Sequence, residues 1–480
     1  MTATQTPTVP DRDLRSGWLL GVLLVGPFMA QADATIVNVA TPSMHANLGA
    51  SAAALELVVG GYLIAFAVLL ITGARLGQTH GYRRVLLAGL ATFSLASLLC
   101  GFAPNPAVLV VGRVLQGTGA ALLFPQTLTG IQLNFSGAGR TRAIGLYAIA
   151  LSCGAVAGQL LGGVLVSANL AGTQWRPIFL VNVPVGAAAM LAALRHLPPD
   201  GRRQVRRIDL LGVATLSASV LLVVLPLVLG RAEGWPAWTW LCLAASLPAF
   251  ASFLAAQRRI TFRGGSPLVN LDAIARPRVA WALMTLLIAT GTYYALLFTL
   301  AQFLQQGLRD SALVSGLTLI PWVAAFGLAG QVVRRLPARV LPLTPAAGCV
   351  LLAAAYAAIS ASQLAGSHSL ALLVVLLGAG GLGLGIQFSS LVAHLTNAVP
   401  SRFAADISGV STTTSQIGGA LGVAAFGTLY LSLAGGGGAH ASHAFAVVAG
   451  AFATVAALAA VTAGRATAAP AGVSDRHPRR

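Results

Sequence analysis

Two ionisable residues, Asp33 and Arg113, lie inside long apolar runs of this sequence and are its first candidates for chemistry. A charge in an apolar run is costly, so residues of this kind usually serve a function. If they pair, they form a proton switch. The arginine favours the ionised carboxylate, removal from water favours the neutral acid, and a small rearrangement loads or releases a proton. The alternative is a static ion pair that orders two helices.

The positions of Asp33 and Arg113 within their runs predict that they can meet. Asp33 lies about seven residues before the outer end of its run and Arg113 about seven residues after the outer start of its own, so at about 1.5 Å per residue both are about 10 Å deep. Glu56, near the outer start of the second run, is a further proton-coupling candidate that we expect to be shallower and solvated. Asp406 is expected to cap the cytoplasmic start of a helix, where the helix dipole favours a carboxylate.

The elements that position these residues are about fourteen apolar runs, each long enough to cross about 30 Å of hydrocarbon. Nearly all of the basic residues, 29 arginines and no lysine, fall in every second gap between the runs. By the positive-inside rule these gaps are cytoplasmic, which places both termini in the cytoplasm and makes the number of spans even. We expect the spans to begin near Trp18, Leu55, Val85, Ala107, Ala143, Ile178, Ile208, Ala237, Val279, Ala312, Leu341, Leu370, Ile407 and Ala444.

The composition is that of a polytopic membrane protein, with 56% hydrophobic residues, 8% charged residues and a mean hydropathy of +0.82. The net charge of +18 is dispersed over short loops, which argues against nucleic-acid binding. The four cysteines stand singly in apolar runs, so no disulfide, metal site or cofactor is expected. The amino-terminal run superficially resembles a signal peptide, but its cleavage would leave an odd number of spans, so we expect it to be retained.

The two halves of the sequence share a weak internal repeat, which is typical of secondary transporters. A loop with paired arginines follows both the second run (73–84) and the tenth (330–339). The predicted organisation is a cytoplasmic tail (1–16), an amino-terminal six-helix bundle (17–196), a cytoplasmic loop (197–207), an inserted helix pair (208–257), a second cytoplasmic loop (258–278), a carboxyl-terminal six-helix bundle (279–464) and a cytoplasmic tail (465–480).

Glycines recur at helical spacing in the fifth and thirteenth runs, at matching places in the two halves. Small residues at this spacing let two helices approach until their backbones touch, which suits an interface that slides or rocks. In a single run, ordinary helix packing is the simpler interpretation, but recurrence in both halves favours a moving interface. The glycines are Gly154, Gly158, Gly162 and Gly163 in the fifth run and Gly418, Gly419, Gly422 and Gly427 in the thirteenth.

Four motifs in this order resemble those of the major facilitator superfamily, and the resemblance covers roughly residues 17 to 464. The run from Arg113 to Ala120, which includes Gln116 and Gly117, is similar to the span-four motif Arg-x-x-Gln-Gly-x-Gly-Ala. The other three resemble motifs of the fourteen-helix drug:proton antiporter branch, in spans one, six and thirteen. They are Asp33 to Ala40 with Pro42, Trp175 to Gly186, and Ser415 to Gly422.

The resemblance implies an all-α major facilitator fold, with two six-helix bundles plus an inserted helix pair. It also implies a proton-coupled exporter of amphipathic organic compounds, such as drugs or secondary metabolites, in the bacterial inner membrane. The expected partners are a small organic substrate, protons and membrane lipids, the expected state is a monomer, and no enzymatic activity is expected. The alternatives are uptake or exchange of a polar metabolite, and a transport-dead membrane sensor or scaffold.

The sequence departs from the family pattern in the loop after span two and in span five. This loop keeps Gly73, Gly81, Arg83 and Arg84, but the family's Asp-Arg pair is Gln78 and Thr79, and a later arginine is Tyr82. A glutamine cannot pair with a charge or complement a helix terminus as a carboxylate does, so we expect a looser cytoplasmic gate. In span five the family's Gly-Pro is Gly158-Gln159, which puts the usual kink in doubt, and near span six its second tryptophan is Pro177.

Polar and aromatic residues at helical spacing are candidates to line a substrate cavity, since aromatic faces with a few amides suit a bulky organic molecule. Helix packing is the alternative for each residue taken singly. Few acids remain in the spans for a cationic substrate, so we expect neutral, zwitterionic or anionic aromatic substrates. The candidates are Phe28, Gln31, Thr35 and Asn38 in span one, Gln116 and Gln126 in span four, and Tyr294, Phe298, Gln302 and Gln305 in span nine.

Overall fold

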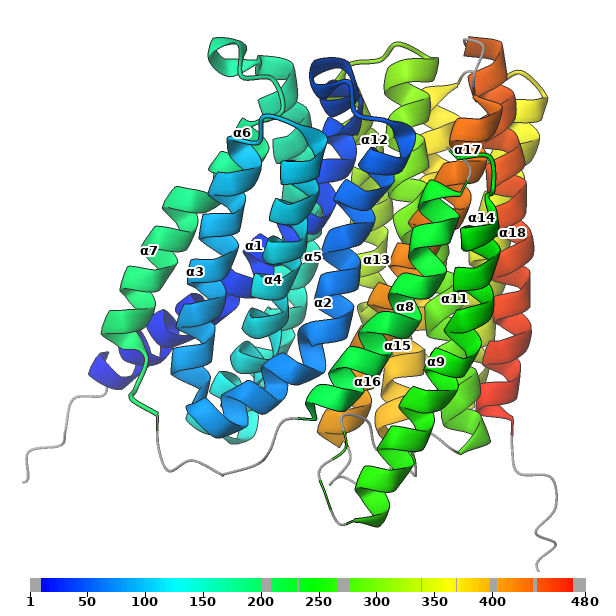
Figure 1. The fold of residues 1–480 in the computed structure, drawn as a ribbon. Helices are drawn as coiled ribbons and strands as arrows, with labels where there is room; N and C mark the ends of the chain where they lie inside the picture. The colour runs from blue at the N-terminus through cyan, green and yellow to red at the C-terminus, as the bar shows by residue number, and fades with distance from the viewer. Residues whose placement is uncertain are drawn as a thin grey trace, which may run out of the picture.

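The computed structural model describes residues 10–200, 209–230, 233–263, 276–337, 339–367, 369–397, 404–434 and 438–468, together with Gly265, Pro267 and Leu271. Within these ranges the chain forms helices and no strands (Figure 1). Helices are the expected solution for an apolar chain in lipid, because each satisfies its own backbone hydrogen bonds.

The amino-terminal half is a bundle in which the first and fifth helices begin several residues before the predicted positions and the others begin close to them. Its second, fourth and sixth spans start at Ala52, Pro106 and Pro177. Side chains cap two of these starts: Ser51 Oγ accepts from the Ala54 amide, and Asn105 Oδ1 from the Val108 amide. The elements are α1 (Pro10–Leu48), α2 (Ala52–His80), α3 (Tyr82–Gly101), α4 (Pro106–Asn134), α5 (Gly137–Ala168), α6 (Pro177–Leu180) and α7 (Asn182–His196).

The inserted pair and the carboxyl-terminal half complete the molecule. The inserted pair is α8 (Leu210–Leu229) and α9 (Ala237–Phe262), and α8 contacts α2, α16 and η5. Short π-helical turns extend α11 and α16. The carboxyl-terminal elements are α11 (Pro277–Gln302), η2 (Phe303–Gly307), α12 (Ala312–Thr318), α13 (Ile320–Arg334), α14 (Thr344–Leu364), α15 (Leu370–Asn397), α16 (Ala404–Gly422), η5 (Val423–Gly427), α17 (Thr428–Leu433) and α18 (Gly438–Thr467).

Thirteen stretches of the described chain are helical, long and apolar enough to cross a membrane. The remaining predicted span, the seventh, corresponds to α8, whose apolar stretch Leu211–Leu227 is shorter; its predicted start at Ile208 lies outside the described residues. Figure 1 shows that α1 begins and α18 ends at the same end of the bundle, as an even number of crossings requires. We name this the inner end and the opposite one the outer end.

Glycines bring helix backbones into contact in both halves. A methyl group added at Gly158 would lie 2.2 Å from the Ala32 carbonyl oxygen, and one added at Gly117 would lie 2.3 Å from that of Tyr62. In the carboxyl-terminal half, a methyl group at Gly418 would lie 2.2 Å from the carbonyl oxygen of Leu287. These distances are far below van der Waals contact, so only glycine permits the observed approach.

Other glycines form the contact between the halves. A methyl group at Gly163 in α5 would lie 2.9 Å from the carbonyl oxygen of Ala312 in α12. One at Gly316 in α12 would lie 2.5 Å from the carbonyl oxygen of Gln159 in α5. The glycine-rich face of α5 therefore reaches the carboxyl-terminal half as well as α1.

Candidate functional site

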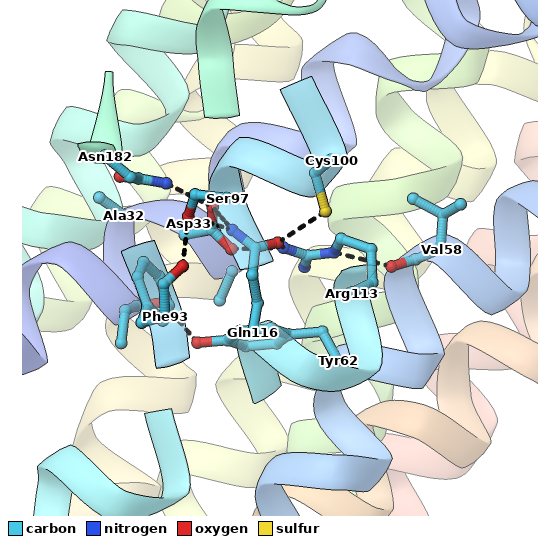
Figure 2. Close-up of polar contacts among 12 residues, drawn as sticks. Ala32, Asp33, Val58, Tyr62, Phe93, Ser97, Cys100, Arg113, Gln116 and Asn182 are labelled. Atoms are coloured by element: carbon cyan, nitrogen blue, oxygen red, sulfur yellow. Dashed lines mark hydrogen bonds and ion pairs between the residues drawn. The ribbon is translucent and has the colours of Figure 1, made fainter. Parts of the chain in front are cut away.

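The centre of the amino-terminal half holds the Asp33–Arg113 pair. Nη1 of Arg113, on α4, donates to Oδ2 of Asp33, on α1 (Figure 2). Asp33 is 1% exposed and Arg113 is 0% exposed. The two residues that the sequence placed at equal depth are thus in direct contact, with both charges removed from water.

Two amides complete the surroundings of Asp33. Its Oδ1 accepts from Asn182 Nδ2 at 2.8 Å and from Gln116 Nε2 at 3.0 Å (Figure 2). Arg113 and the two amides together make three donors, from α4 and α7, that favour the ionised carboxylate. Burial acts in the opposite direction and favours the neutral acid. Asn182 was not among the predicted site residues, although it stands in the span-six motif as a polar residue in an apolar run.

Arg113 is held by three further groups. Its Nε donates to the Val58 carbonyl at 2.9 Å and its Nη1 to Gln116 Oε1 at 2.9 Å, while its guanidinium carbon lies 4.4 Å from the centre of the Tyr62 ring. Its Nη2 is buried and has no hydrogen-bond partner within the described structure. The arginine therefore joins α4 to α1 and α2, with one donor to spare.

Gln116 connects the ion pair to α3. Its Nε2 donates to Ser97 Oγ at 2.8 Å, and its Oε1 also accepts from the Cys100 thiol at 3.4 Å (Figure 2). Both ends of this amide are taken up by the network. We call Asp33, Arg113, Gln116 and Asn182 the central network.

Three other amino-terminal cavity candidates donate side-chain hydrogen bonds to backbone carbonyls, two of them on a neighbouring helix. Thr35 Oγ1 donates to the Ala155 carbonyl on α5 at 3.1 Å, and Gln126 Nε2 donates to the Gly73 carbonyl on α2 at 2.8 Å. Asn38 Nδ2 donates to the Ala34 carbonyl of its own helix at 3.2 Å. All three candidate side chains are fully buried.

The span-nine candidates lie between the two halves. At the outer end of α11, Gln302 Nε2 donates to Thr41 Oγ1 at 3.4 Å, and Gln305 Nε2 donates to the Val39 carbonyl at 2.8 Å. Deeper on the same helix, the Tyr294 hydroxyl lies near the side-chain amides of Gln31 on α1 and Gln416 on α16. Phe298 is fully buried and packs near Gly427.

Glu56 is buried, so the expectation that it is solvated is wrong. It is 2% exposed, and the Thr428 hydroxyl lies 2.9 Å from Oε2 and 3.1 Å from Oε1. That hydroxyl also lies 3.3 Å from the Leu227 carbonyl of α8. Position within α2 suggested a shallow residue, but helices from the other half and from the inserted pair cover it.

The comparisons with known proteins agree with this architecture. The profile of the Major Facilitator Superfamily matches residues 23–423. The chain belongs to this superfamily. A solved structure of a bacterial homologue of the human lysosomal transporter Spinster, in an inward-facing and unoccupied conformation, has a TM-score of 0.67 at 17% identity and covers 96% of this chain and 98% of that one, which shows the shared fold.

Several relatives within the superfamily are similar along most of their length. The probable actinorhodin transporter of Streptomyces coelicolor is 35% identical over 421 residues, which cover 87% of this chain and 72% of that one. Cephamycin export protein CmcT of Amycolatopsis lactamdurans is 34% identical over 431 residues, covering 87% and 85%. The tetracenomycin C resistance and export protein of Streptomyces glaucescens is 32% identical over 416 residues, covering 86% and 75%.

The superfamily's loop motif after span two is supported here by an acid from another loop. Gly81 has a φ of +94°, and Asp200 accepts hydrogen bonds from the amides of Arg83 at 2.9 Å and Arg84 at 3.3 Å, at the start of α3. Arg83 also donates to the Leu194 carbonyl at 2.6 Å. Asp200 was missed because it lies more than a hundred residues along the chain.

The structure describes the surroundings of Gln159, one departure from the superfamily pattern, but not those of Gln78, the other. Gln159, in the place of the span-five proline, is buried and donates through Nε2 to the Thr35 carbonyl at 3.3 Å, and α5 runs as one helix from Gly137 to Ala168. The side chains of Gln78 and Asp406 lie outside the described part of the structure, so their predicted roles as gate and cap remain predictions.

Proposed function

We propose that this superfamily member is a proton-coupled exporter of amphipathic organic compounds, such as antibiotics or other secondary metabolites. The relatives support this class of substrate: a probable actinorhodin transporter, a cephamycin export protein and a tetracenomycin C resistance and export protein. We place it in the bacterial cell membrane as a monomer. The inner end and both termini are in the cytoplasm in this proposal, because the arginine-rich gaps predict a cytoplasmic location by the positive-inside rule.

The central network is the observation that carries the proton coupling. Asp33 takes up a proton in this proposal, and its attraction to Arg113 then falls because the carboxyl becomes neutral. Arg113 also holds the Val58 carbonyl of α2. A change in protonation therefore alters how α1 packs against α2, α4 and α7, which is how a local charge can bias a two-state transporter.

The contacts between the halves support a state that is closed at the outer end. Three hydrogen bonds join outer segments of the two halves: Gln302 to Thr41, Gln305 to the Val39 carbonyl, and the Leu313 amide to Ser167 Oγ at 3.1 Å. A transporter closed on that side is ready to accept a substrate from the cytoplasm, as an exporter requires.

The substrate is expected to be neutral, zwitterionic or anionic. Among the described residues, the buried acids are Asp33, engaged with Arg113, and Glu56, engaged with Thr428. A dication moved into this interior would need carboxylates to replace its lost water.

The test is Asp33→Asn in proteoliposomes with an imposed pH gradient. We expect proton-driven transport to be lost while substrate exchange without a gradient continues, because the amide cannot carry the proton. Asp310→Asn, the same change in an outer loop, is the matched control and should transport normally. Normal gradient-driven transport by Asp33→Asn would contradict the proposed coupling.

A further inference from the structure

Helix α9 has most of its surface outside the protein. Only 17% of its most apolar stretch is buried, which is the smallest share among the candidate spans that the structure describes. Its buried residues, Thr239, Ser246, Phe253 and Gln257, form one stripe at helical spacing, and α9 packs on α8. The rest of its described surface is largely uncovered by protein, so in a membrane it would contact lipid.

A shallow depression of about 590 Å³ lies along this exposed surface at the inner end of α9. Its described lining residues recur at steps of three and four, so they lie on one face of the helix. The face is apolar and has small side chains nearer the middle of the membrane, and it is basic where the helix ends. It comprises Ala251, Leu254, Ala255, Arg258, Arg259, Phe262 and Arg263, which we call the α9 face.

The three arginines of the α9 face have no acidic partner among the residues that the structure describes, where the one ion pair joins Arg113 to Asp33. All three are exposed, and Phe262 between them is 90% exposed. Guanidinium groups match the oxygens of a phosphate in pairs, so such a cluster selects a phosphate-bearing anion. An exposed phenylalanine beside basic residues is typical of helices at the boundary between acyl chains and headgroups.

We propose that the α9 face binds an anionic phospholipid. Its phosphodiester lies on the arginines and one acyl chain lies along Ala251, Leu254 and Ala255, where small side chains leave room. At about 1.5 Å per residue, Ala251 is about 10 Å from Arg258 along the helix, so the apolar and basic parts follow the order of groups in a lipid. This site is separate from the central network and does not depend on the proposed transport function.

The test is a lipid titration of the full-length protein in detergent, followed by native mass spectrometry, with phosphatidylglycerol and with phosphatidylcholine of the same acyl chains. We expect the unmodified protein to retain phosphatidylglycerol preferentially. The triple variant R258Q/R259Q/R263Q should bind it about a hundredfold more weakly, since each arginine near an anionic headgroup contributes about fivefold. Ala255→Phe keeps all three charges and should also weaken binding, because it fills the acyl path.

The control variant R334Q/R335Q/R339Q removes three exposed arginines near the inner end of α13 and should bind phosphatidylglycerol like the unmodified protein. Equal losses in the two triple variants would overturn the proposal, since they would show general attraction to a basic surface. Equal retention of the two lipids, or displacement of phosphatidylglycerol by an equal concentration of glycerol phosphate, would overturn it as well.

Discussion

The two halves of this transporter share their packing but differ in their buried polar groups. In the amino-terminal half the interior contains Asp33, Glu56 and Arg113, and the acids are hydrogen-bonded. In the described carboxyl-terminal half the buried polar residues are uncharged. Buried polar atoms without a partner occur in both halves, and here they include both ends of the Gln387 amide and the Trp322 indole nitrogen.

The carboxyl-terminal half contains an aromatic cluster where the other half has charges. Trp322 stacks on Tyr293 and on Tyr356, with ring centres 6.1 Å and 5.8 Å apart, and Phe326 and Phe452 extend the cluster. Aromatic faces with a few amides suit the binding of a bulky organic molecule, whereas a buried carboxylate beside an arginine can take up and release a proton. Together with the proposed function, this difference predicts a division of labour, with proton chemistry in the amino-terminal half and most substrate contacts in the carboxyl-terminal half.

The strongest test of this division removes the charge that balances Asp33. Arg113→Met should destabilise the protein by about 3–5 kcal/mol, because it leaves a buried carboxylate without its partner. The measurement is thermal unfolding in detergent. The double variant Asp33→Asn with Arg113→Met should recover part of the loss, and a double variant as unstable as the single one would mean that the pair is not coupled.

The shared packing predicts equal effects in the two halves. Gly117→Ala and Gly418→Ala each force a methyl group against a carbonyl oxygen and should cost about 1–3 kcal/mol of stability. Gly60→Ala is the matched control, since nothing lies within 4 Å of the added carbon. A loss confined to one half would show that the halves are packed differently.

Removing the Tyr294 hydroxyl, which lies between the halves, should change the affinity for substrate and leave the pH dependence of transport unchanged. Tyr294→Phe removes the hydroxyl that lies near the side-chain amides of Gln31 and Gln416 and should change substrate affinity by about 0.5–1.5 kcal/mol. Substrate titration at several pH values gives both quantities. If the pH dependence of transport moves instead of the affinity, the proposed division between the halves fails.

The smallest expected effect concerns the loop after span two. Gln78→Asp restores the family's carboxylate and should stabilise closure at the cytoplasmic side by about 0.3–1 kcal/mol if it meets a helix terminus. The rate at which a cytoplasmic thiol reagent labels an engineered cysteine reports this closure. An unchanged rate would exclude a gating role for Gln78.

The sequence by itself determined the spans and the depth of the main ion pair. Apolar length is decisive in lipid, because every backbone polar group must be satisfied within its helix, so the predicted starts at Ala237, Ala312 and Leu370 match the helices. Equal depth in two spans was enough to predict that Asp33 can meet Arg113. Both inferences use distances along one helix axis, which the sequence contains.

The tertiary structure decided which side chains surround these residues. Asn182 reaches Asp33 from a helix 149 positions later, and Thr428 covers Glu56 from 372 positions later. Such contacts depend on the rotation of each helix about its axis and on which helices are its neighbours. Hydropathy predicts neither, because lipid and protein interior are equally apolar. For the same reason, only the packed molecule showed that one face of α9 stays exposed.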